Sequence, residues 1–309
     1  MNGLIIRTTG SAYHVLLADG SQVEAFVKGN FRIKGIRSTN PVAVGDRVRL
    51  EQQPDGTNWI TEIGDRSNYI VRRSTNLSKQ SHILAANVDQ VALLITLNYP
   101  VTATTFIDRL LATCEAYGVP VIMLFNKEDI LGEEERQEQN YLMQLYSSLG
   151  YTTAAISAAD LSADRRAELL SLMCGKTTLL SGNSGVGKST LLNALCGEQR
   201  AKTAPISDVH NQGKHTTTFS EMYFLAEDTR LIDTPGIRGF GTFDFKREEV
   251  GHYFRDIFAV GRQCRFGNCL HTDEPGCAVL EAVEHGRIAP SRYTSYLSLL
   301  GDCDERKYR

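Results

Sequence analysis

Two short motifs that together could bind a nucleoside triphosphate occur in an unusual order along this chain. Residues 126–129, Asn-Lys-Glu-Asp, have the form of a guanine-reading motif, and residues 182–189 fit the phosphate-loop pattern G-x-x-x-x-G-K-S. In an ordinary GTPase the phosphate loop comes first and the base-reading motif last. Here the base-reading motif precedes the phosphate loop by more than fifty residues. The order predicts a GTPase-type domain whose segments are circularly permuted.

The phosphate loop matches its pattern at every position. Its glycines let backbone N–H groups turn toward phosphate oxygens. Lys188 would contact the β- and γ-phosphates, and the Ser189 hydroxyl would ligate Mg²⁺. A strand pattern over residues 177–181 and a helical pattern over 190–195 flank the loop, so the helix N-terminus would face the anion. The nucleotide-binding residues expected here are Gly182, Asn183, Ser184, Gly185, Val186, Gly187, Lys188, Ser189 and Thr190.

A second phosphate-sensing motif, DxxG, begins at Asp233, 45 residues after Lys188. Asp233 would lie near Mg²⁺, and the N–H group of Gly236 would contact the γ-phosphate. Between the two motifs, one threonine of residues 216–218 is expected to ligate Mg²⁺ in the GTP state, and we assign Thr217. The alternative is a polar loop with incidental threonines.

The base-reading motif follows a continuous apolar run over residues 121–125, the pattern of a strand buried on both faces. At the end of that strand, Asn126, Lys127 and Asp129 would bind guanine. The Asp129 carboxylate would accept hydrogen bonds from the ring N–H and the exocyclic amine, a donor pair that adenine lacks, so GTP is favoured over ATP. One strand further on, Ser157 and Ala158 are similar to the second base-contacting loop of GTPases.

Cysteine spacing near the C-terminus predicts a metal site. Cys264, Cys269, His271 and Cys277 lie within fourteen residues and supply the four ligands of a closed tetrahedral Zn²⁺ shell, which is typical of a structural site. A redox cluster or a chance grouping is the alternative. The other cysteines fall in helical patterns and are expected to be core or surface thiols: Cys114, Cys174, Cys196 and Cys303.

Composition is that of a globular protein with more than one domain. The chain has 309 residues, 42% hydrophobic and 22% charged, enough for two or three domains. Its net charge of −3 and pI of about 6.2 do not indicate general affinity for nucleic acid. Apolar runs are far too short for a membrane span, and the N-terminus lacks a signal-peptide pattern. We therefore expect a cytoplasmic protein without membrane contact, and a monomer.

The segments that must position these motifs fall into three domains. Residues 1–72 show about five short strands with turn residues between them, which suits an OB-type β-barrel. Residues 73–84 are polar and are interpreted as a linker, and residues 85–241 alternate strands and helices, as a parallel α/β sheet requires. Residues 242–309 are mainly helical around the cysteine cluster.

The predicted elements are strands at 13–17, 47–50, 59–63, 91–95, 121–125 and 152–156 and helices at 106–117, 134–149, 248–260 and 290–297. Basic side chains of the barrel could form an RNA-binding face with Phe31 available for stacking, although a solvated surface explains them equally well. These basic residues are Arg32, Lys34, Arg37, Arg47 and Arg49.

Taken together, the chain resembles the family of ribosome small subunit-dependent GTPase A (RsgA or YjeQ-like). The resemblance rests on the permuted motif order, on Gly213-Lys214-His215 followed by three threonines, and on the cysteine cluster within residues 264–277. It implies an OB domain, a permuted GTPase domain and a zinc domain. It also implies binding of GTP and GDP with Mg²⁺, and GTP hydrolysis stimulated by the small ribosomal subunit and its rRNA during late maturation.

This sequence departs from related GTPases at two catalytic positions. Ile237 stands where Ras-like enzymes place a water-orienting Gln, and residues 241–244 lack the His that some family members use after DxxG. His215 is therefore the expected catalytic candidate, beside Lys188, Ser189 and Thr217. At Gly185, related K⁺-assisted GTPases carry Asn.

Two other functions remain open from the sequence. One is a GTP-gated RNA-binding module with incidental hydrolysis, and the other is a nucleotide-metabolising P-loop enzyme, for which the sequence shows no further catalytic cluster. The chain after Gly236 leads directly toward the cysteine cluster, so residues 237–241 could act as a lever that turns the zinc domain when the γ-phosphate is lost. The alternative is a passive connection beside a rigid domain interface.

Overall fold

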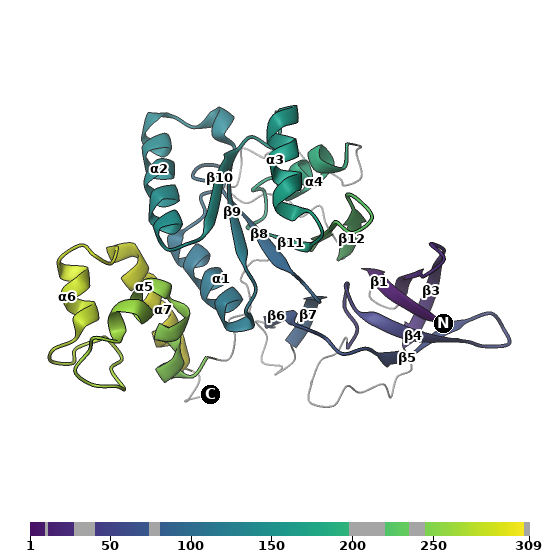
Figure 1. Ribbon diagram of the computed structural model, residues 1–309, viewed down its shortest axis with the longest axis horizontal. Helices are drawn as coiled ribbons and strands as arrows, with labels where there is room; N and C mark the ends of the chain where they lie inside the picture. The colour runs from purple at the N-terminus through teal and green to yellow at the C-terminus, as the bar shows by residue number, and fades with distance from the viewer. Residues whose placement is uncertain (10–11, 28–40, 74–80, 198–219, 235–244, 306–309) are drawn as a thin grey trace.

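The computed structural model of the chain describes residues 1–9, 12–27, 41–73, 81–197, 220–234 and 245–305. A β-barrel, a central α/β domain and a small helical domain follow one another along the chain (Figure 1). The barrel and the helical domain lie on opposite sides of the central domain. This arrangement confirms the predicted class: an N-terminal OB-type β-barrel, a central P-loop domain and a mainly helical C-terminal domain.

Five strands close the N-terminal barrel. They are β1 (Asn2–Thr8), β2 (Tyr13–Leu17), β3 (Gln22–Val27), β4 (Arg47–Gln52) and β5 (Asn58–Ile63). The strands pair in the order β1-β2-β3-β5-β4, and β4 also pairs with β1, which closes the barrel. In β4, Val48 and Leu50 are buried and alternate with the exposed Arg47 and Arg49, because successive side chains of a strand point to opposite faces. The strands predicted within residues 13–63 are confirmed.

A two-stranded antiparallel hairpin follows the barrel, formed by β6 (Tyr69–Arg73) and β7 (Ser81–Ala86). β6 ends at Arg73 and β7 begins at Ser81, so both strands extend into residues 73–84, the polar segment predicted as a linker; the linker stays a prediction. Burial holds β7 in place, because Ile83 and Leu84 are 7% and 9% exposed and pack into the interior. The other predicted boundaries, which divide the chain into 1–72, 85–241 and 242–309, stay predictions.

The central sheet contains six strands. They are β8 (Gln90–Ile95), β9 (Val121–Asn126), β10 (Thr152–Ile156), β11 (Thr177–Ser181), β12 (Glu221–Phe224) and β13 (Arg230–Asp233). Their order is β10-β9-β8-β11-β13-β12, and only β12 runs antiparallel to its neighbour. Every residue of β8, β9 and β11 is buried, as strands covered on both faces require.

Two pairs of helices cover the two faces of this sheet. They are α1 (Thr104–Tyr117), α2 (Glu133–Ser148), α3 (Ala163–Met173) and α4 (Lys188–Cys196). Alternate strand residues divide between the faces: Leu93 packs in the core that contains α1 and α2, and Leu94 packs in the core that contains α3 and α4. Because the strands are parallel, their carboxyl ends meet at one edge, where the loops carrying the predicted motifs come together.

The C-terminal domain consists of three short helices and one longer one within the described residues. They are the 3₁₀ helix η2 (Arg247–Tyr253), α5 (Arg255–Gly261), α6 (Ala278–Glu284) and α7 (Pro290–Glu305). The continuous helix predicted over residues 248–260 is broken at Phe254, whose backbone is extended with φ −111° and ψ 104°. Phe254 is fully buried among the domain's apolar residues, and this packing overrides the helical periodicity. Within the described ranges, no helix is long and apolar enough to cross a membrane.

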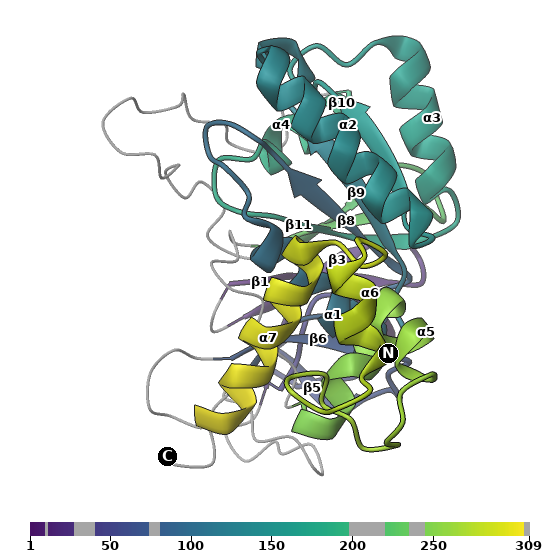
Figure 2. The ribbon, with the colours of Figure 1, turned by 90° about the vertical axis from the view of Figure 1, so that its left-hand side faces the viewer.

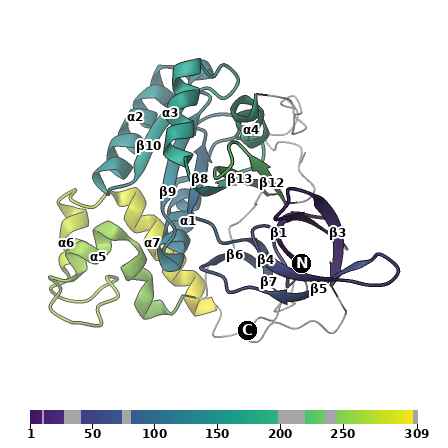
Figure 3. The ribbon, with the colours of Figure 1, turned by 45° about the vertical axis from the view of Figure 1, so that its right-hand side comes forward.

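The barrel joins the central domain through backbone pairing. β1 pairs with β12 at Arg7 and Glu221, which extends the central sheet into the barrel (Figure 3). On the hairpin side, Val44 forms a bridge with Ala85, and the Ala86 N–H donates to the Val44 carbonyl at 2.9 Å. Barrel and central-domain side chains also share one apolar core. The two domains are therefore packed together rather than connected by a free chain.

A buried ion pair fixes the end of the barrel that faces the hairpin. Asp46 is fully buried, and both its oxygens accept hydrogen bonds from Arg66 at 2.6 Å. Asp46 also accepts from the Ala43 N–H at 2.8 Å, and Arg66 donates to the Pro41 carbonyl at 2.7 Å. Removal of the guanidinium would leave a buried carboxylate without its counter-charge, which is far more costly than loss of a surface pair.

We predict that Arg66→Met lowers the free energy of unfolding of the full chain by about 3–5 kcal/mol. The matched control is Arg49→Met, because Arg49 pairs with Glu62 at 3.2 Å on the surface, with both side chains more than 60% exposed. This control should cost no more than about 1 kcal/mol. Urea unfolding followed by fluorescence of Trp59 in the barrel measures both variants. Equal destabilisation by the two substitutions would contradict a structural role for the buried pair.

Candidate nucleotide and metal sites

The phosphate loop lies between β11 and α4, at the carboxyl edge of the parallel sheet. Three of its glycines have left-handed backbones, with φ of 139° at Gly182, 85° at Gly185 and 102° at Gly187. A Cβ atom at Gly182 would lie 2.6 Å from the Leu94 carbonyl oxygen, and one at Gly187 would lie 2.3 Å from Asn126 Nδ2. Glycine is thus required for a loop whose backbone can wrap around an anion.

Lys188, the first residue of α4, points back into this loop. Its Nζ donates hydrogen bonds to the carbonyl oxygens of Gly182 at 2.9 Å and Asn183 at 2.8 Å. Burial lowers the pKa of Lys188 to about 8, and the negative charge of Asp233 opposes that shift. Phosphate oxygens would be stronger acceptors than carbonyls for this ammonium group, because they carry charge. Ser189, the next residue, is half-buried.

Asn126 ties the base-reading strand to the phosphate loop. It ends β9, is 3% exposed, and donates from Nδ2 to the Val186 carbonyl oxygen at 2.7 Å. Its Oδ1 accepts from the Ala158 N–H at 2.9 Å. Three segments that are distant in sequence are therefore held together by one side chain. The sequence predicted each segment, but not that Asn126 would join them.

Asp129 and Lys127 lie at the rim of the same site. The Ser157 hydroxyl donates to Asp129 Oδ1 at 2.6 Å, which orients the carboxylate expected to read guanine. Lys127 has a left-handed backbone with φ 69°, and its Nζ donates to the Tyr99 carbonyl oxygen. Burial lowers the pKa of Lys127, and the charge of Asp129 opposes that shift. The structure thus brings Ser157 and Ala158 beside the base-reading motif.

Asp233 ends β13 next to the phosphate loop. It is 1% exposed, and its charge acts on Lys188 across the site. The remaining predicted residues, His215, Thr217 and Gly236, lie outside the residues that the structure describes. Within the described part of the chain, the predicted nucleotide-binding residues therefore come together around one edge of the sheet.

The four predicted zinc ligands form a compact cluster. The ligand atoms of Cys264, Cys269, His271 and Cys277 all lie within 4.8 Å of one another. The Cys264 and Cys277 sulfurs are 3.9 Å apart, and His271 Nδ1 is 3.5 Å and 3.4 Å from them. A tetrahedron with ordinary Zn–S and Zn–N bonds has edges of about 3.8 Å and 3.6 Å. The donor set and its spacing therefore fit a closed four-ligand metal site.

Residues around the cluster hold in place the turn that carries His271. The spacing of the cysteines and the histidine did not predict this role. Glu274 accepts from the backbone N–H groups of Leu270 at 2.5 Å and Thr272 at 2.9 Å. Although burial alone would raise it, these N–H donors lower the pKa of Glu274 to about 2. Tyr293 and Tyr296 of α7 donate to backbone carbonyls of the same turn. A carboxylate inside a Cys/His cluster is the sequence signal that could have indicated this support.

The four cysteines outside the cluster agree with their predicted core and surface positions. Cys114 is buried in α1, where burial raises the pKa of its thiol well above the usual range. Cys174 is exposed, and Cys196 and Cys303 are partly buried. None of these four side chains belongs to the metal-ligand cluster found within the described residues.

Comparisons with known families match nearly the whole chain. The sequence model of the RsgA GTPase family matches residues 63–243, and that of the RsgA N-terminal domain matches residues 2–60. A protein of Bacteroides fragilis named small ribosomal subunit biogenesis GTPase RsgA is 58% identical over 309 residues, 100% of this chain and 99% of the relative. A protein of Phocaeicola vulgatus with the same name is 56% identical over 310 residues, again 100% and 99% of the two chains.

Solved structures show the same architecture. The crystal structure of YjeQ from Thermotoga maritima matches with a TM-score of 0.73 and 29% identity over 98% of each chain. The structure of YloQ, described as a circularly permuted GTPase, matches with a TM-score of 0.70 and 26% identity over 100% of this chain and 96% of that one. The fold is therefore shared along the full length of the chain.

We predict that Gly187→Ala weakens binding of a fluorescent guanine nucleotide about ten- to 100-fold. The reason is that its left-handed backbone becomes strained and the new methyl group displaces Asn126. Gly197→Ala is the matched control. Gly197 has φ 74° at the other end of α4, but a Cβ there would meet its nearest neighbour only at 3.9 Å. This control should change affinity about twofold at most. Similar nucleotide affinities of the two variants would contradict the assignment of Gly187 to a phosphate-binding loop that requires glycine.

Proposed function

Because this chain belongs to the RsgA GTPase family, whose sequence model covers most of it, we propose that it binds the small ribosomal subunit and hydrolyses GTP during late maturation of that subunit. The names of the relatives from Bacteroides fragilis and Phocaeicola vulgatus support the maturation role. The full-length match of the fold supports the transfer of that role to this chain.

One observation in the structure supports the proposal that the chain binds a guanine nucleotide. Asn126 makes hydrogen bonds to both the phosphate loop and the Ala158 backbone, so a base-reading edge and a phosphate cradle are held at fixed separation. A guanine nucleotide requires both parts of this site, because its base and its phosphates lie at opposite ends of the molecule. Asp129, oriented by Ser157, would accept from the guanine N–H donors.

The remaining residues have roles that follow from their chemistry. We assign Lys188 to the β- and γ-phosphates, where its charge would be balanced by the ligand. Ser189, Thr217 and Asp233 would hold Mg²⁺, whose charge would stabilise the phosphate oxygens. The backbone N–H of Gly236 would contact the γ-phosphate. His215 would position the attacking water or the segment around it, since Ile237 cannot.

We also propose that the protein works as a cytoplasmic monomer and contacts rRNA through its flanking domains. On the barrel, Arg47 and Arg49 are exposed on one face of β4 and could contact phosphates. The other basic residues predicted for this face, together with Phe31, lie outside the described residues. The metal bound by the C-terminal cluster is proposed to be one structural Zn²⁺ per chain.

The test of this function is GTP turnover with and without purified ribosomal subunits. Small subunits should raise the turnover number by at least about tenfold, and large subunits should not, because contact with the small subunit would position the catalytic groups at the γ-phosphate. Lys188→Ala should abolish turnover under both conditions. His215→Ala should lower the stimulated turnover more than it lowers GTP affinity. Equal, slow turnover with and without small subunits would instead favour a GTP-gated RNA-binding module.

We predict guanine selectivity that depends on Asp129. Asp129→Asn replaces an acceptor with a group that mismatches guanine and suits xanthine, so GTP affinity should fall about 5- to 150-fold. The same substitution should raise the affinity for XTP. Competition titrations against a fluorescent GDP measure both affinities, and Glu128→Gln is a control at the neighbouring residue. The base-reading assignment fails if Asp129→Asn leaves the preference for GTP unchanged.

We predict one Zn²⁺ per chain by elemental analysis. Cys277→Ser should release the metal and lower the thermal stability of the C-terminal domain, because a structural metal supplies folding free energy to a small core. Guanine-nucleotide affinity should change little, since the cluster lies in a separate core from the phosphate loop. Cys174→Ser is the control, because this exposed thiol is not in the cluster. Metal-free protein with an ordered C-terminal domain would contradict the assignment.

A further inference from the structure

The C-terminal domain docks on α1 through a row of complementary charges. α1 carries Asp108, Arg109 and Glu115, and the C-terminal domain opposes these three charges with Arg292, Asp302 and Arg255. Ala112 of α1 lies between these charges and packs into the apolar core of the C-terminal domain. Figure 2 shows α7 lying across α1. We call these three ion pairs the α1 charge row.

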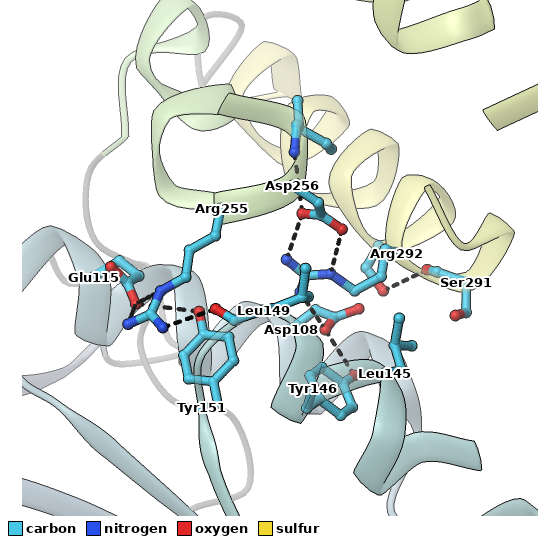
Figure 4. Close-up of polar contacts among 12 residues, drawn as sticks. Asp108, Glu115, Leu145, Tyr146, Leu149, Tyr151, Arg255, Asp256, Ser291 and Arg292 are labelled. Carbon is cyan, nitrogen blue, oxygen red and sulfur yellow. Dashed lines mark hydrogen bonds and ion pairs between the residues drawn. The ribbon is translucent and has the colours of Figure 1, made fainter. Parts of the chain in front are cut away.

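The central pair of the α1 charge row is fully buried. Arg292 is 1% exposed and donates to Asp108 Oδ1 at 2.6 Å (Figure 4). Its other nitrogens donate to the two oxygens of Asp256 at 2.9 Å and 3.1 Å, and Asp108 also accepts from the Tyr146 hydroxyl at 2.8 Å. The guanidinium carbon lies 4.8 Å from the centre of the Phe254 ring. Arg292 therefore links α7, α5, α1 and α2.

The two outer pairs are partly exposed and use Arg109 and Glu115, which both follow Asp108 on α1. Arg255 pairs with Glu115 at 2.7 Å, donates to the Leu149 carbonyl at 3.0 Å, and lies 4.0 Å over the Tyr151 ring. Arg109 pairs with Asp302 at 2.5 Å and also donates to the Ser298 hydroxyl at 2.9 Å. Both arginines thus have several partners, so neither pair is an isolated surface contact.

The buried pair of Arg292 and Asp108, with the two outer pairs, favours a single register between the two surfaces. A slide along α1 by one helical turn, about 5.4 Å, would separate Arg292 from Asp108 and leave both charges buried without partners. The same slide would move each outer arginine or carboxylate away from its opposite charge. Flexible domain motion needs an interface that tolerates such displacements. The α1 charge row does not tolerate them.

Both ends of the segment between the central and C-terminal domains are also anchored. Thr234, which directly follows β13, is fully buried. Phe245, where the described chain resumes, is 5% exposed and packs in the same core as Ala112 of α1. The lever predicted at residues 237–241 lies outside the described residues. Among the two possibilities that the sequence left open, these contacts favour the rigid interface over the lever.

We infer that the α1 charge row locks the C-terminal domain onto the central domain in a single register, which is the same with GDP and with GTP. The two domains then present one continuous rigid surface to a partner. In this arrangement the loss of the γ-phosphate does not turn the C-terminal domain. This inference does not depend on which partner the protein binds.

A distance measurement on the full-length, metal-loaded protein tests the lock. Spin labels attached to p-acetylphenylalanine at Glu138 of α2 and Glu284 of α6 leave every cysteine unmodified, and both positions are exposed. The expected result is one narrow distance distribution with the same centre when the protein is saturated with GDP or with a non-hydrolysable GTP analogue. Distributions with different centres in the two states would overturn the lock and favour the lever.

Charge reversal tests whether the α1 charge row sets the register. The one-sided variant Arg109→Glu/Glu115→Arg should broaden the distance distribution, because like charges then face each other at both outer pairs. Adding Asp302→Arg and Arg255→Glu restores opposite charges and should narrow the distribution again. The buried central pair stays intact in both variants, and retained fluorescent-GDP affinity shows that the central domain is folded. Two outcomes would show that charge does not set the register. One is a distance distribution in the one-sided variant as narrow as in wild type, and the other is a distribution that stays broad in the variant with all four substitutions.

Discussion

The geometry of the nucleotide site depends on the hydrogen bonds of one buried amide. Asn126 bonds to Val186, 60 residues away in the chain, and to Ala158, 32 residues away. With the side chain 3% exposed, loss of either bond would leave a buried polar group without its partner, at a cost of about 1–3 kcal/mol. The phosphate loop and the two base-contacting loops are consequently held as one unit, which a ligand spanning base and phosphates requires.

This constraint also explains why the permuted order of the motifs is compatible with a GTPase site. The contacts of Asn126 depend on where β9, β10 and β11 end in space, and all three strands run parallel in one sheet. The order of these strands along the sequence does not affect the contacts of Asn126. Permutation instead changes what is attached to the ends of the sheet, because the chain enters at β8 from the hairpin and leaves after β13 toward the C-terminal domain.

The sequence predicted most of the central domain because local signals and tertiary burial agree there. Runs such as residues 121–125 are apolar throughout, and a strand buried on both faces has that composition. The same agreement held for the phosphate loop, whose glycines are required by its backbone. It failed at Phe254, where burial against residues distant in sequence decided the local conformation.

The domain interface could not be predicted for a related reason. Arg292 and Asp108 are 184 residues apart, and a lone arginine or aspartate in a helical segment is ordinarily solvated. Only the docking of α7 on α1 makes both charges buried partners. The metal ligands, in contrast, were predictable because all four occur within one short segment and have a characteristic spacing. Short-range chemistry was visible in the sequence, whereas long-range electrostatics was not.

The two flanking domains are attached to the nucleotide site by different routes. Asp233 pairs across the sheet with Glu221 of β12, and Glu221 pairs in turn with Arg7 of the barrel strand β1. Backbone pairing therefore joins Asp233 to the barrel across two neighbouring strand pairs. The C-terminal domain contacts the opposite part of the domain, on α1 and α2, through side-chain charges. The barrel is therefore the domain joined by backbone pairing to the residue beside the phosphate loop.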